Sequence, residues 1–147
     1  MNKLHNNYNI VVAEDDEDDY LLITEALKGL DNIGHIHWSK DGDELLSYLD
    51  ACEHSDTVGE KTPSLIILDF NMPKKDGREA LAEIKNHPER KKIPVIILTT
   101  SQANSDIDQA YQLGANSFIQ KPFKYVDFKY AMEILLKYWL KIVKLNS

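Results

Sequence analysis

Hydrophobic and polar residues follow one another along the chain in a pattern that predicts strands and helices in turn. Short apolar runs rich in β-branched residues are typical of buried strands, whereas apolar residues spaced three or four positions apart indicate amphipathic helices. The predicted strands are Tyr8–Ala13, Ile33–Trp38, Leu65–Leu68, Pro94–Leu98 and Ser117–Ile119, and the predicted helices are Asp16–Leu30, Asp41–Ala51, Gly77–Asn86, Ala103–Leu113 and Tyr125–Val143. The pattern is therefore a strand followed by a helix, repeated five times.

This alternation predicts the α/β fold class, in which helices cover both faces of a parallel sheet. The runs Leu65–Leu68 and Pro94–Leu98 are apolar throughout, as expected of strands that helices bury on both sides. We therefore expect a doubly wound, five-stranded parallel sheet with five helices, in the common flavodoxin-like strand order 2-1-3-4-5. We also expect a single domain over residues 1–147, with its core at about 8–143 and no output domain.

Composition narrows the classes of protein to which the chain can belong. A net charge of −7 argues against nonspecific binding to nucleic acid. No apolar run approaches the roughly 20 residues of a membrane span, and the polar start of the chain does not resemble a signal peptide. The single cysteine, Cys52, cannot form an internal disulfide. We therefore expect a cytoplasmic protein that binds neither nucleic acid nor a membrane.

Polar side chains follow four of the five predicted strands. Glu14 and Asp15 follow the first strand and Asp69 follows the third. Thr99 ends the fourth strand, and Lys121 comes soon after the fifth. The carboxyl ends of parallel strands meet at one edge of the sheet, and the expected order places the first and third strands side by side. The three carboxylates should therefore share one crevice, with the hydroxyl and the ammonium group beside it.

Three carboxylates in one crevice repel one another unless one is protonated or a cation lies among them. Carboxylate oxygens suit a hard divalent ion such as Mg²⁺, which commonly binds a phosphate as well. Lys121 and the Thr99 hydroxyl can contact the oxygens of such a phosphate, and an aspartate is a competent nucleophile for phosphoryl transfer. The crevice is therefore a candidate site for phosphorylation of a carboxylate.

The residues at these strand ends resemble the response regulator receiver family, the phosphate-accepting half of two-component signalling. The resemblance covers nearly the whole chain and is carried by Val11–Asp15, Leu65–Pro73 with Asp76-Gly77, Pro94–Ser101 and Phe118–Phe123. The chain is also similar to single-domain receivers associated with phytochrome-type histidine kinases, in Asp76–Lys85, Leu113–Asn116 and Tyr138–Leu140. A histidine kinase, with a phytochrome-like kinase as the candidate, is therefore the implied partner.

The resemblance implies a role for each residue of the crevice. Asp69 would accept the phosphoryl group, and Lys121 would pair with the phosphate. Mg²⁺ would bind the side chains of Asp15 and Asp69 and the backbone carbonyl of Asn71. Glu14 would act through a metal-bound water.

The resemblance also implies how a signal would leave the site. Thr99 would move toward the phosphate, and Phe118 would turn inward behind it as an aromatic switch residue. The Lys121–Pro122 peptide would be cis, a form that proline makes accessible. The chain would then signal through phosphorylation-dependent contact with other proteins. It would be a switch with self-limited autodephosphorylation and not an enzyme.

The last predicted helix carries more apolar residues than one buried face requires. The inward stripe is predicted to be Phe128, Met132, Leu135, Leu136 and Trp139. Tyr130, Ile134, Tyr138 and Leu140 lie outside that stripe, although tyrosines tolerate partial exposure. We therefore expect a partner surface on this helix, used either for a homodimer or for docking to another protein.

The acidic run continues beyond the crevice residues through Asp16, Glu17, Asp18 and Asp19. Acidic side chains at the start of a helix interact favourably with the helix dipole. We therefore interpret these four residues as structural.

Three other functions fit parts of the pattern less well. A phosphohydrolase with Asp69 as nucleophile requires an aspartate two positions later as general acid, and Asn71 cannot serve as one. A flavin-binding domain of the same topology requires hydroxyls and glycines after the first strand, where Glu14–Asp16 would repel the flavin phosphate. A degenerate receiver that acts only as an adaptor is disfavoured because the crevice is intact.

Overall fold

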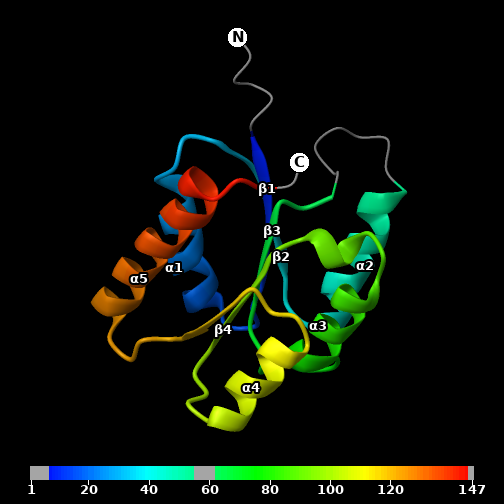
Figure 1. Cartoon of the computed structure of the whole chain (residues 1–147). Helices are drawn as coiled ribbons and strands as arrows, with labels where there is room; N and C mark the ends of the chain where they lie inside the picture. The colour runs from blue at the N-terminus through cyan, green and yellow to red at the C-terminus, as the bar shows by residue number, and fades with distance from the viewer. Residues whose placement is uncertain (1–6, 55–61, 146–147) are drawn as a thin grey trace.

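The computed structural model describes residues 7–54 and 62–145, which form a parallel sheet between two layers of helices (Figure 1). The strands are β1 (Tyr8–Ala13), β2 (Ile33–Ser39), β3 (Leu65–Leu68), β4 (Val95–Thr99) and β5 (Ser117–Gln120). The helices are α1 (Glu17–Lys28), α2 (Gly42–Glu53), α3 (Gly77–Asn86), α4 (Asn104–Gln112) and α5 (Tyr125–Lys137), with short turns η3 (Arg90–Lys92) and η4 (Tyr138–Ile142). The strand order is β2-β1-β3-β4-β5, so the predicted fold class and topology are confirmed.

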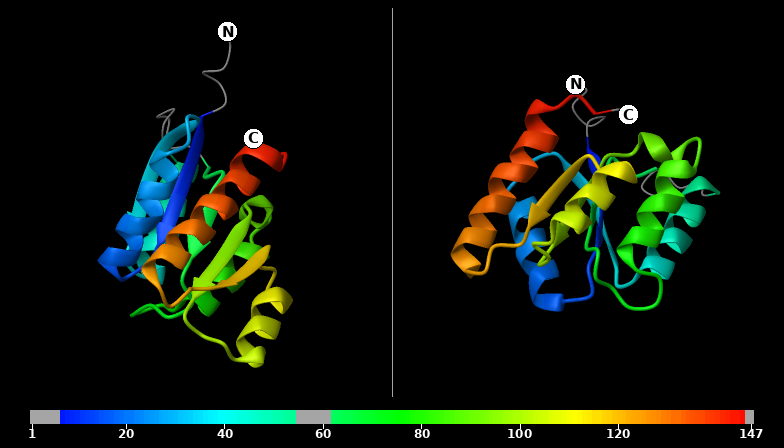
Figure 2. Two further views of the ribbon diagram at one scale, coloured as in Figure 1. Left: turned by 90° about the vertical axis from the view of Figure 1, so that its left-hand side faces the viewer. Right: turned by 60° about the horizontal axis from the view of Figure 1, so that its bottom comes forward.

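Two hydrophobic clusters, one on each face of the sheet, form the core. Neighbouring residues of a strand point to opposite faces. The strand residues packed against α1 and α5 are Ile10, Val12, Leu65, Ile67, Ile96 and Leu98. Those packed on the side of α2, α3 and α4 are Val11, Ala13, Ile66, Leu68, Val95 and Ile97. Figures 1 and 2 show these layers, with α1 and α5 in contact along one face. β3 and β4 are buried on both faces, as their apolar sequences predict.

Aspartate side chains cap three helices at the edge where the strands end. The Asp16 carboxylate accepts a hydrogen bond from the Asp19 amide at 3.1 Å, and Asp41 accepts one from the Glu44 amide at 2.9 Å. Asp76 caps α3 in the same way. Each such cap is typically worth about 1 kcal/mol. The caps therefore stabilise the loops after β1, β2 and β3, which carry the predicted crevice.

The last helix packs on α1 and ends in one widened turn. The Val143 amide donates to the Tyr138 carbonyl at 2.9 Å, the five-residue spacing of a π-turn. The predicted inward residues Phe128, Met132, Leu136 and Trp139 are buried, and Leu135 is partly buried. The expectation that Leu140 lies outside this face is wrong, because its side chain is only 2% exposed. Leu140 follows Leu136 by four positions and therefore continues the buried ridge.

The connection between α2 and β3 falls largely outside the described residues, and α2 extends through Glu53, two residues beyond the predicted end at Ala51. Within the described part of the chain, none of the helices combines the length and apolarity that a membrane span requires.

Candidate functional site

The carboxylates predicted to share a crevice lie together at the carboxyl ends of β1 and β3. Ala13 pairs with Leu68 in the sheet, and the Asp69 amide donates to the Ala13 carbonyl at 3.0 Å. This register brings the residues that follow the two strands side by side. One carboxylate oxygen from each of Glu14, Asp15 and Asp69 lies within 4.8 Å of the others. Glu14 and Asp69 are buried and Asp15 is exposed, so the cluster opens to solvent on one side.

Lys121 reaches this cluster from the end of β5. Its ammonium nitrogen lies 2.8 Å from Glu14 Oε1, 2.8 Å from Asp19 Oδ2 and 3.1 Å from Asp69 Oδ2. The lysine side chain is only 7% exposed. A buried ammonium group is stable only when charged or polar partners replace its hydration shell. The three carboxylates therefore both hold Lys121 in place and depend on its charge.

Burial and charge act against each other at these side chains. Burial raises the pKa of Glu14 to about 8, the charge of Asp69 adds to this effect, and Lys121 opposes it. Burial alone would lower the pKa of Lys121, but the Glu14 and Asp19 carboxylates outweigh it and hold that pKa above its usual range. Negative charge is thus costly in the crevice, and a further cation among the carboxylates would relieve that cost.

The donor set fits a hard divalent cation. Glu14, Asp15 and Asp69 offer only carboxylate oxygens, without nitrogen or sulfur donors, and hard cations such as Mg²⁺ prefer oxygen ligands. Asn71, predicted to add its backbone carbonyl, lies next to the cluster, because its own amide donates to Asp69 Oδ1 at 3.0 Å. The residues predicted to bind the metal are therefore assembled in one place.

The loop after β3 approaches the backbone of α3 very closely. The Gly77 amide donates to the Phe70 carbonyl at 2.9 Å. A β-carbon at Gly77 would lie 2.3 Å from the Asp69 carbonyl oxygen and 2.7 Å from the Phe70 α-carbon. A glycine at this position therefore allows the loop that carries Asp69 to pack against the start of α3.

Thr99 and Phe118, predicted as switch residues, lie on the neighbouring strands β4 and β5. The buried Thr99 hydroxyl accepts hydrogen bonds from the Asn71 side-chain amide at 3.0 Å and from the Ser101 amide at 3.4 Å. Phe118 is partly buried and meets Phe70 edge to face, with 6.1 Å between ring centroids. In this structure Thr99 is thus held by a loop residue next to Asp69.

The prediction of a cis peptide at Lys121–Pro122 is wrong, because every peptide bond in the described residues is trans. The trans bond nevertheless leaves the Lys121 ammonium group within 3.1 Å of Asp69. In this structure the lysine therefore reaches the cluster without a cis bond.

Asp19 is a site residue that the sequence reading missed. The structural interpretation holds for Asp16, which caps α1, but it is incomplete for Asp19, whose carboxylate binds Lys121. The sequence held no signal that separates Asp19 from its acidic neighbours, because its role depends on the path of Lys121 from the end of β5. Asp18 is exposed, and its side chain makes no hydrogen bond or ion pair within the part of the chain that the structure describes.

Trp38 is a second residue that the sequence reading missed. Its indole Nε1–H donates to the backbone carbonyl of Glu14 at 2.7 Å. The ring stacks on Tyr20 with a centroid separation of 4.1 Å, and the Lys40 ammonium lies 4.9 Å from the indole centroid. Trp38 is the penultimate residue of β2, where it pairs with Val12 of β1. The hydrogen bond from Trp38 therefore helps to fix the backbone of Glu14, the first residue of the acidic loop.

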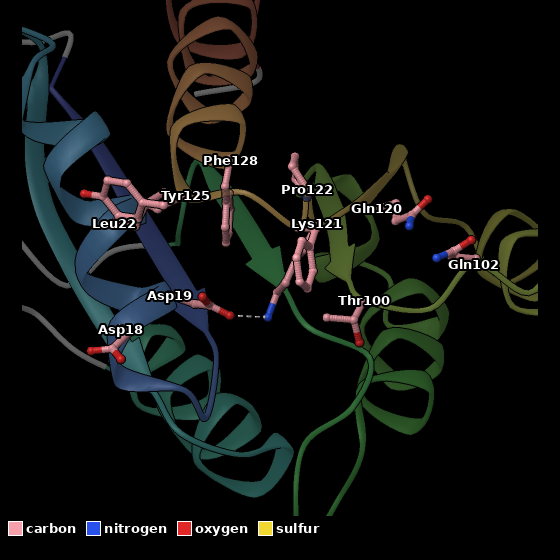
Figure 3. A pocket seen from close by; sticks show the side chains of 11 residues that line it. Asp18, Asp19, Leu22, Thr100, Gln102, Gln120, Lys121, Pro122, Tyr125 and Phe128 are labelled. Carbon is pink, nitrogen blue, oxygen red and sulfur yellow. Dashed lines mark hydrogen bonds and ion pairs between the residues drawn. The ribbon is translucent and has the colours of Figure 1, made fainter.

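A groove of about 620 Å³ lies beside the cluster, between the start of α1 and the loop that follows β5 (Figure 3). Asp18, Asp19 and Leu22 line it from α1, and Lys121 and Pro122 line it from the opposite side. Figure 3 shows the Lys121–Asp19 contact at its floor. The groove therefore exposes one partner of the buried lysine to solvent.

Comparison with known proteins identifies relatives over almost the full chain. Residues 10–133 match the model of the response regulator receiver domain. FilR2 of Methanothrix harundinacea, a probable methanogenesis regulatory protein, is 37% identical over 131 residues, which cover 89% of this chain and 83% of FilR2. The response regulator Rcp1 of Synechocystis is 35% identical over 138 residues, which cover 94% of this chain and 92% of Rcp1.

Solved structures of such proteins superpose closely on this fold. The phosphorylated cyanobacterial phytochrome response regulator RcpA gives a TM-score of 0.88 at 36% identity, over 96% of this chain and 99% of RcpA. The Mn²⁺-bound form of Rcp1 gives a TM-score of 0.85 at 36% identity, over 95% of this chain and 99% of that protein. Together with the strand-end crevice, these matches establish that the chain belongs to the response regulator receiver family.

Proposed function

We propose that the chain accepts a phosphoryl group on Asp69, with Mg²⁺ as the cofactor, from the phosphohistidine of a histidine kinase. The observation that carries this proposal is the contact of Asp69 with Lys121 inside the cluster that Glu14 and Asp15 complete. Receiver domains bind Mg²⁺ or Mn²⁺ at such an acidic site, and Rcp1 has been solved with Mn²⁺. Receivers are signalling switches and not classical enzymes, so the phosphorylated state is itself the product.

In the proposed transfer, an Asp69 carboxylate oxygen forms a bond to phosphorus while the phosphorus–nitrogen bond of the phosphohistidine breaks. Bound Mg²⁺ would neutralise charge on the transferring group, which is the main catalytic requirement of phosphoryl transfer. Asp15, Asp69, the Asn71 carbonyl and, through a water, Glu14 would hold the ion. Lys121 then donates to a phosphoryl oxygen.

The proposed switch starts from the hydrogen bond between Thr99 and Asn71. The Thr99 oxygen accepts a hydrogen bond from the Asn71 amide at 3.0 Å, which leaves its own O–H to donate to a phosphoryl oxygen when the side chain moves toward Asp69. Such a movement would vacate space next to the partly buried Phe118, which we propose turns further inward. The phosphoryl group, with a charge of about −1.5 to −2, would thus bias one surface between two states. Hydrolysis of the aspartyl phosphate would end the signal.

We further propose that the kinase is phytochrome-like. RcpA is a phytochrome response regulator and resembles this chain over nearly its full length. FilR2, a probable methanogenesis regulatory protein, has a similar sequence identity to this chain. The test is a phosphotransfer assay that compares the rate of transfer to this chain from a phytochrome-type kinase with the rate from an unrelated histidine kinase. Equal transfer rates from both kinases would contradict a phytochrome-like partner.

A homodimer through the last helix is proposed because α5 and η4 expose a self-complementary row of apolar residues. The exposed row is Val126, Tyr130, Ile134, Tyr138 and Ile142, spaced four residues apart. Rows at this spacing form the ridges by which helices pack. The row is symmetric in sequence about Ile134. In an antiparallel pair with its twofold axis at Ile134, Tyr130 of one copy would therefore face Tyr138 of the other.

Charges beside this row have the same symmetry. Asp127 precedes Ile134 by seven positions, and Lys141 follows it by seven. The antiparallel arrangement would bring Asp127 of one copy near Lys141 of the other, a lysine that within its own chain pairs with Asp31 at 2.9 Å. A second copy of the chain is thus an occupant that suits both the apolar and the charged positions.

Sedimentation of the native chain and two variants tests the dimer. Ile134→Glu would place two like charges at the axis and is expected to give a monomer. Leu21→Glu is the control, because Leu21 is similarly exposed but lies on α1; it should sediment as the native chain does. A native chain that stays monomeric both with and without beryllofluoride would contradict the dimer.

The phosphoacceptor role is tested by binding of beryllofluoride, a mimic of the aspartyl phosphoryl group. Calorimetric titration in the presence of Mg²⁺ is expected to show one site on the native chain. Asp69→Asn, which removes the attachment oxygen, should abolish that binding, while Asp18→Asn should retain it. Binding that survives in Asp69→Asn would overturn the assignment of Asp69.

A further inference from the structure

The Lys121 ammonium group has a full set of hydrogen-bond acceptors. An ammonium group carries three N–H donors, and here three carboxylates lie within 3.1 Å: Glu14, Asp19 and Asp69. A phosphoryl group bonded to one Asp69 oxygen would carry its own negatively charged oxygens, which lie beyond the carboxylate oxygen that Lys121 contacts now. If Lys121 moves to donate to such an oxygen, it keeps Asp69 as a partner through the phosphoryl group and moves away from another partner.

The three partners differ in what their release would cost. The side chains of Glu14 and Asp69 are 2% and 6% exposed, whereas that of Asp19 is 26% exposed. Asp69 would keep Lys121 through its phosphoryl oxygen. A buried carboxylate such as Glu14 that loses its partner is desolvated without compensation, whereas a carboxylate at a surface regains water. Asp19 lines the groove in Figure 3 and is the most exposed of the three, so it is the partner released at the lowest cost.

We propose that Asp19 is an internal competitor for Lys121, which the phosphoryl group on Asp69 displaces into the groove. This inference rests on the proposed function of Asp69 and adds a residue to it. In the unphosphorylated chain, Asp19 takes one lysine donor that the phosphoryl group needs. The carboxylate therefore weakens the phosphorylated state relative to the unphosphorylated one.

The displacement also gives the groove two states. With Lys121 bound, the Asp19 carboxylate closes the floor between α1 and the loop after β5. Once released, the same carboxylate adds a free negative charge to the α1 side of the groove, next to Asp18. Phosphorylation would therefore change the charge that the groove presents, independently of Thr99 and Phe118.

A matched pair of variants tests the competition. Asp19→Asn and Asp18→Asn each remove one negative charge from the first turn of α1, but only Asp19 contacts Lys121. In the presence of Mg²⁺, Asp19→Asn is expected to bind beryllofluoride about fivefold more tightly than the native chain, the upper range for a partly exposed ion pair. Asp18→Asn should change the affinity by less than about twofold, because an exposed charge is screened by water and salt.

Three outcomes are informative. Equal effects of the two variants, or weaker binding in Asp19→Asn, would overturn the competition while leaving Asp69 as the acceptor. A native chain that does not bind beryllofluoride with Mg²⁺ would instead overturn the proposed function. Thermal unfolding of both variants shows whether each is folded at the assay temperature.

A second measurement needs no variant of the site. The carbon-13 signals of the Asp18 and Asp19 carboxyl groups are followed by NMR as beryllofluoride is added to the native chain. The Asp19 signal is expected to move toward that of a hydrated carboxylate, while the Asp18 signal stays. An Asp19 signal that does not move at saturating beryllofluoride would contradict its displacement.

Discussion

Replacing Gly77 by alanine would push directly on the backbone of Asp69. The added β-carbon would lie 2.3 Å from the Asp69 carbonyl oxygen and 2.7 Å from the Phe70 α-carbon, both of which are backbone atoms. Neither atom belongs to a flexible side chain, so α3 and the loop after β3 would have to separate. Gly29→Ala is the matched control, because its nearest contact, at 3.5 Å from the Ala26 carbonyl oxygen, is ordinary.

The expected cost of Gly77→Ala follows from two opposing effects. Overpacking against fixed backbone costs about 3 kcal/mol at the upper end of its usual range. Alanine in place of glycine in a helix returns about 1 kcal/mol. The net loss of unfolding free energy is therefore about 2 kcal/mol, which corresponds to a fall in melting temperature of about 4–8 °C for a domain of this size.

Two assays follow the change. Urea unfolding should show the loss of about 2 kcal/mol for Gly77→Ala, while Gly29→Ala should stay within about 0.5 kcal/mol of the native chain or exceed it slightly. Beryllofluoride affinity should fall about tenfold or more in Gly77→Ala, because the Asp69 carboxylate moves relative to Lys121. If Gly77→Ala had the same stability and the same beryllofluoride affinity as the native chain, the predicted clash with the backbone of Asp69 and Phe70 would be refuted.

Two further predictions concern Trp38 and Glu53. Trp38→Phe keeps an aromatic ring beside Tyr20 but removes the indole donor to the Glu14 carbonyl. The loss of this hydrogen bond, about 1 kcal/mol, should weaken Mg²⁺ binding about fivefold in a calorimetric titration. Unchanged binding would show that the hydrogen bond does not position the loop. A hydrogen bond from Arg90 holds the pKa of Glu53 below its usual range, so this contact stabilises the fold above about pH 5 and loses its effect as the pH falls through the depressed pKa. Glu53→Gln should therefore be less stable than the native chain in urea at pH 7 and equally stable in strong acid, whereas an equal difference at both pH values would contradict the ion pair.

The sheet could be predicted from sequence because its central strands leave little ambiguity. The runs Leu65–Leu68 and Pro94–Leu98 are apolar at every position, as expected of strands that are covered by helices on both faces. The same pattern located the crevice, because the first polar residue after each strand marks the edge of the sheet. Glu14, Asp69 and Lys121 could therefore be grouped without coordinates, and the structure places them in contact.

The remaining features depend on side-chain direction, which strand and helix patterns do not specify. Asp19 looks like a helix-start acid until the path of Lys121 is known, since their contact joins residues 102 positions apart. Trp38 reads as a strand residue until its indole nitrogen is seen to reach the Glu14 carbonyl. Leu140 was predicted on the wrong face, although it follows the buried Leu136 by four positions and therefore lies on the same side of the helix.

The most direct test of the account is the mass of the intact chain after incubation with a small phosphodonor, with and without Mg²⁺. The native chain should gain one phosphoryl group only when Mg²⁺ is present, and the modification should map to Asp69. Asp69→Asn should gain none under the same conditions. Mg²⁺-dependent phosphorylation that persists in Asp69→Asn, or a native chain that gains no phosphoryl group, would contradict the account.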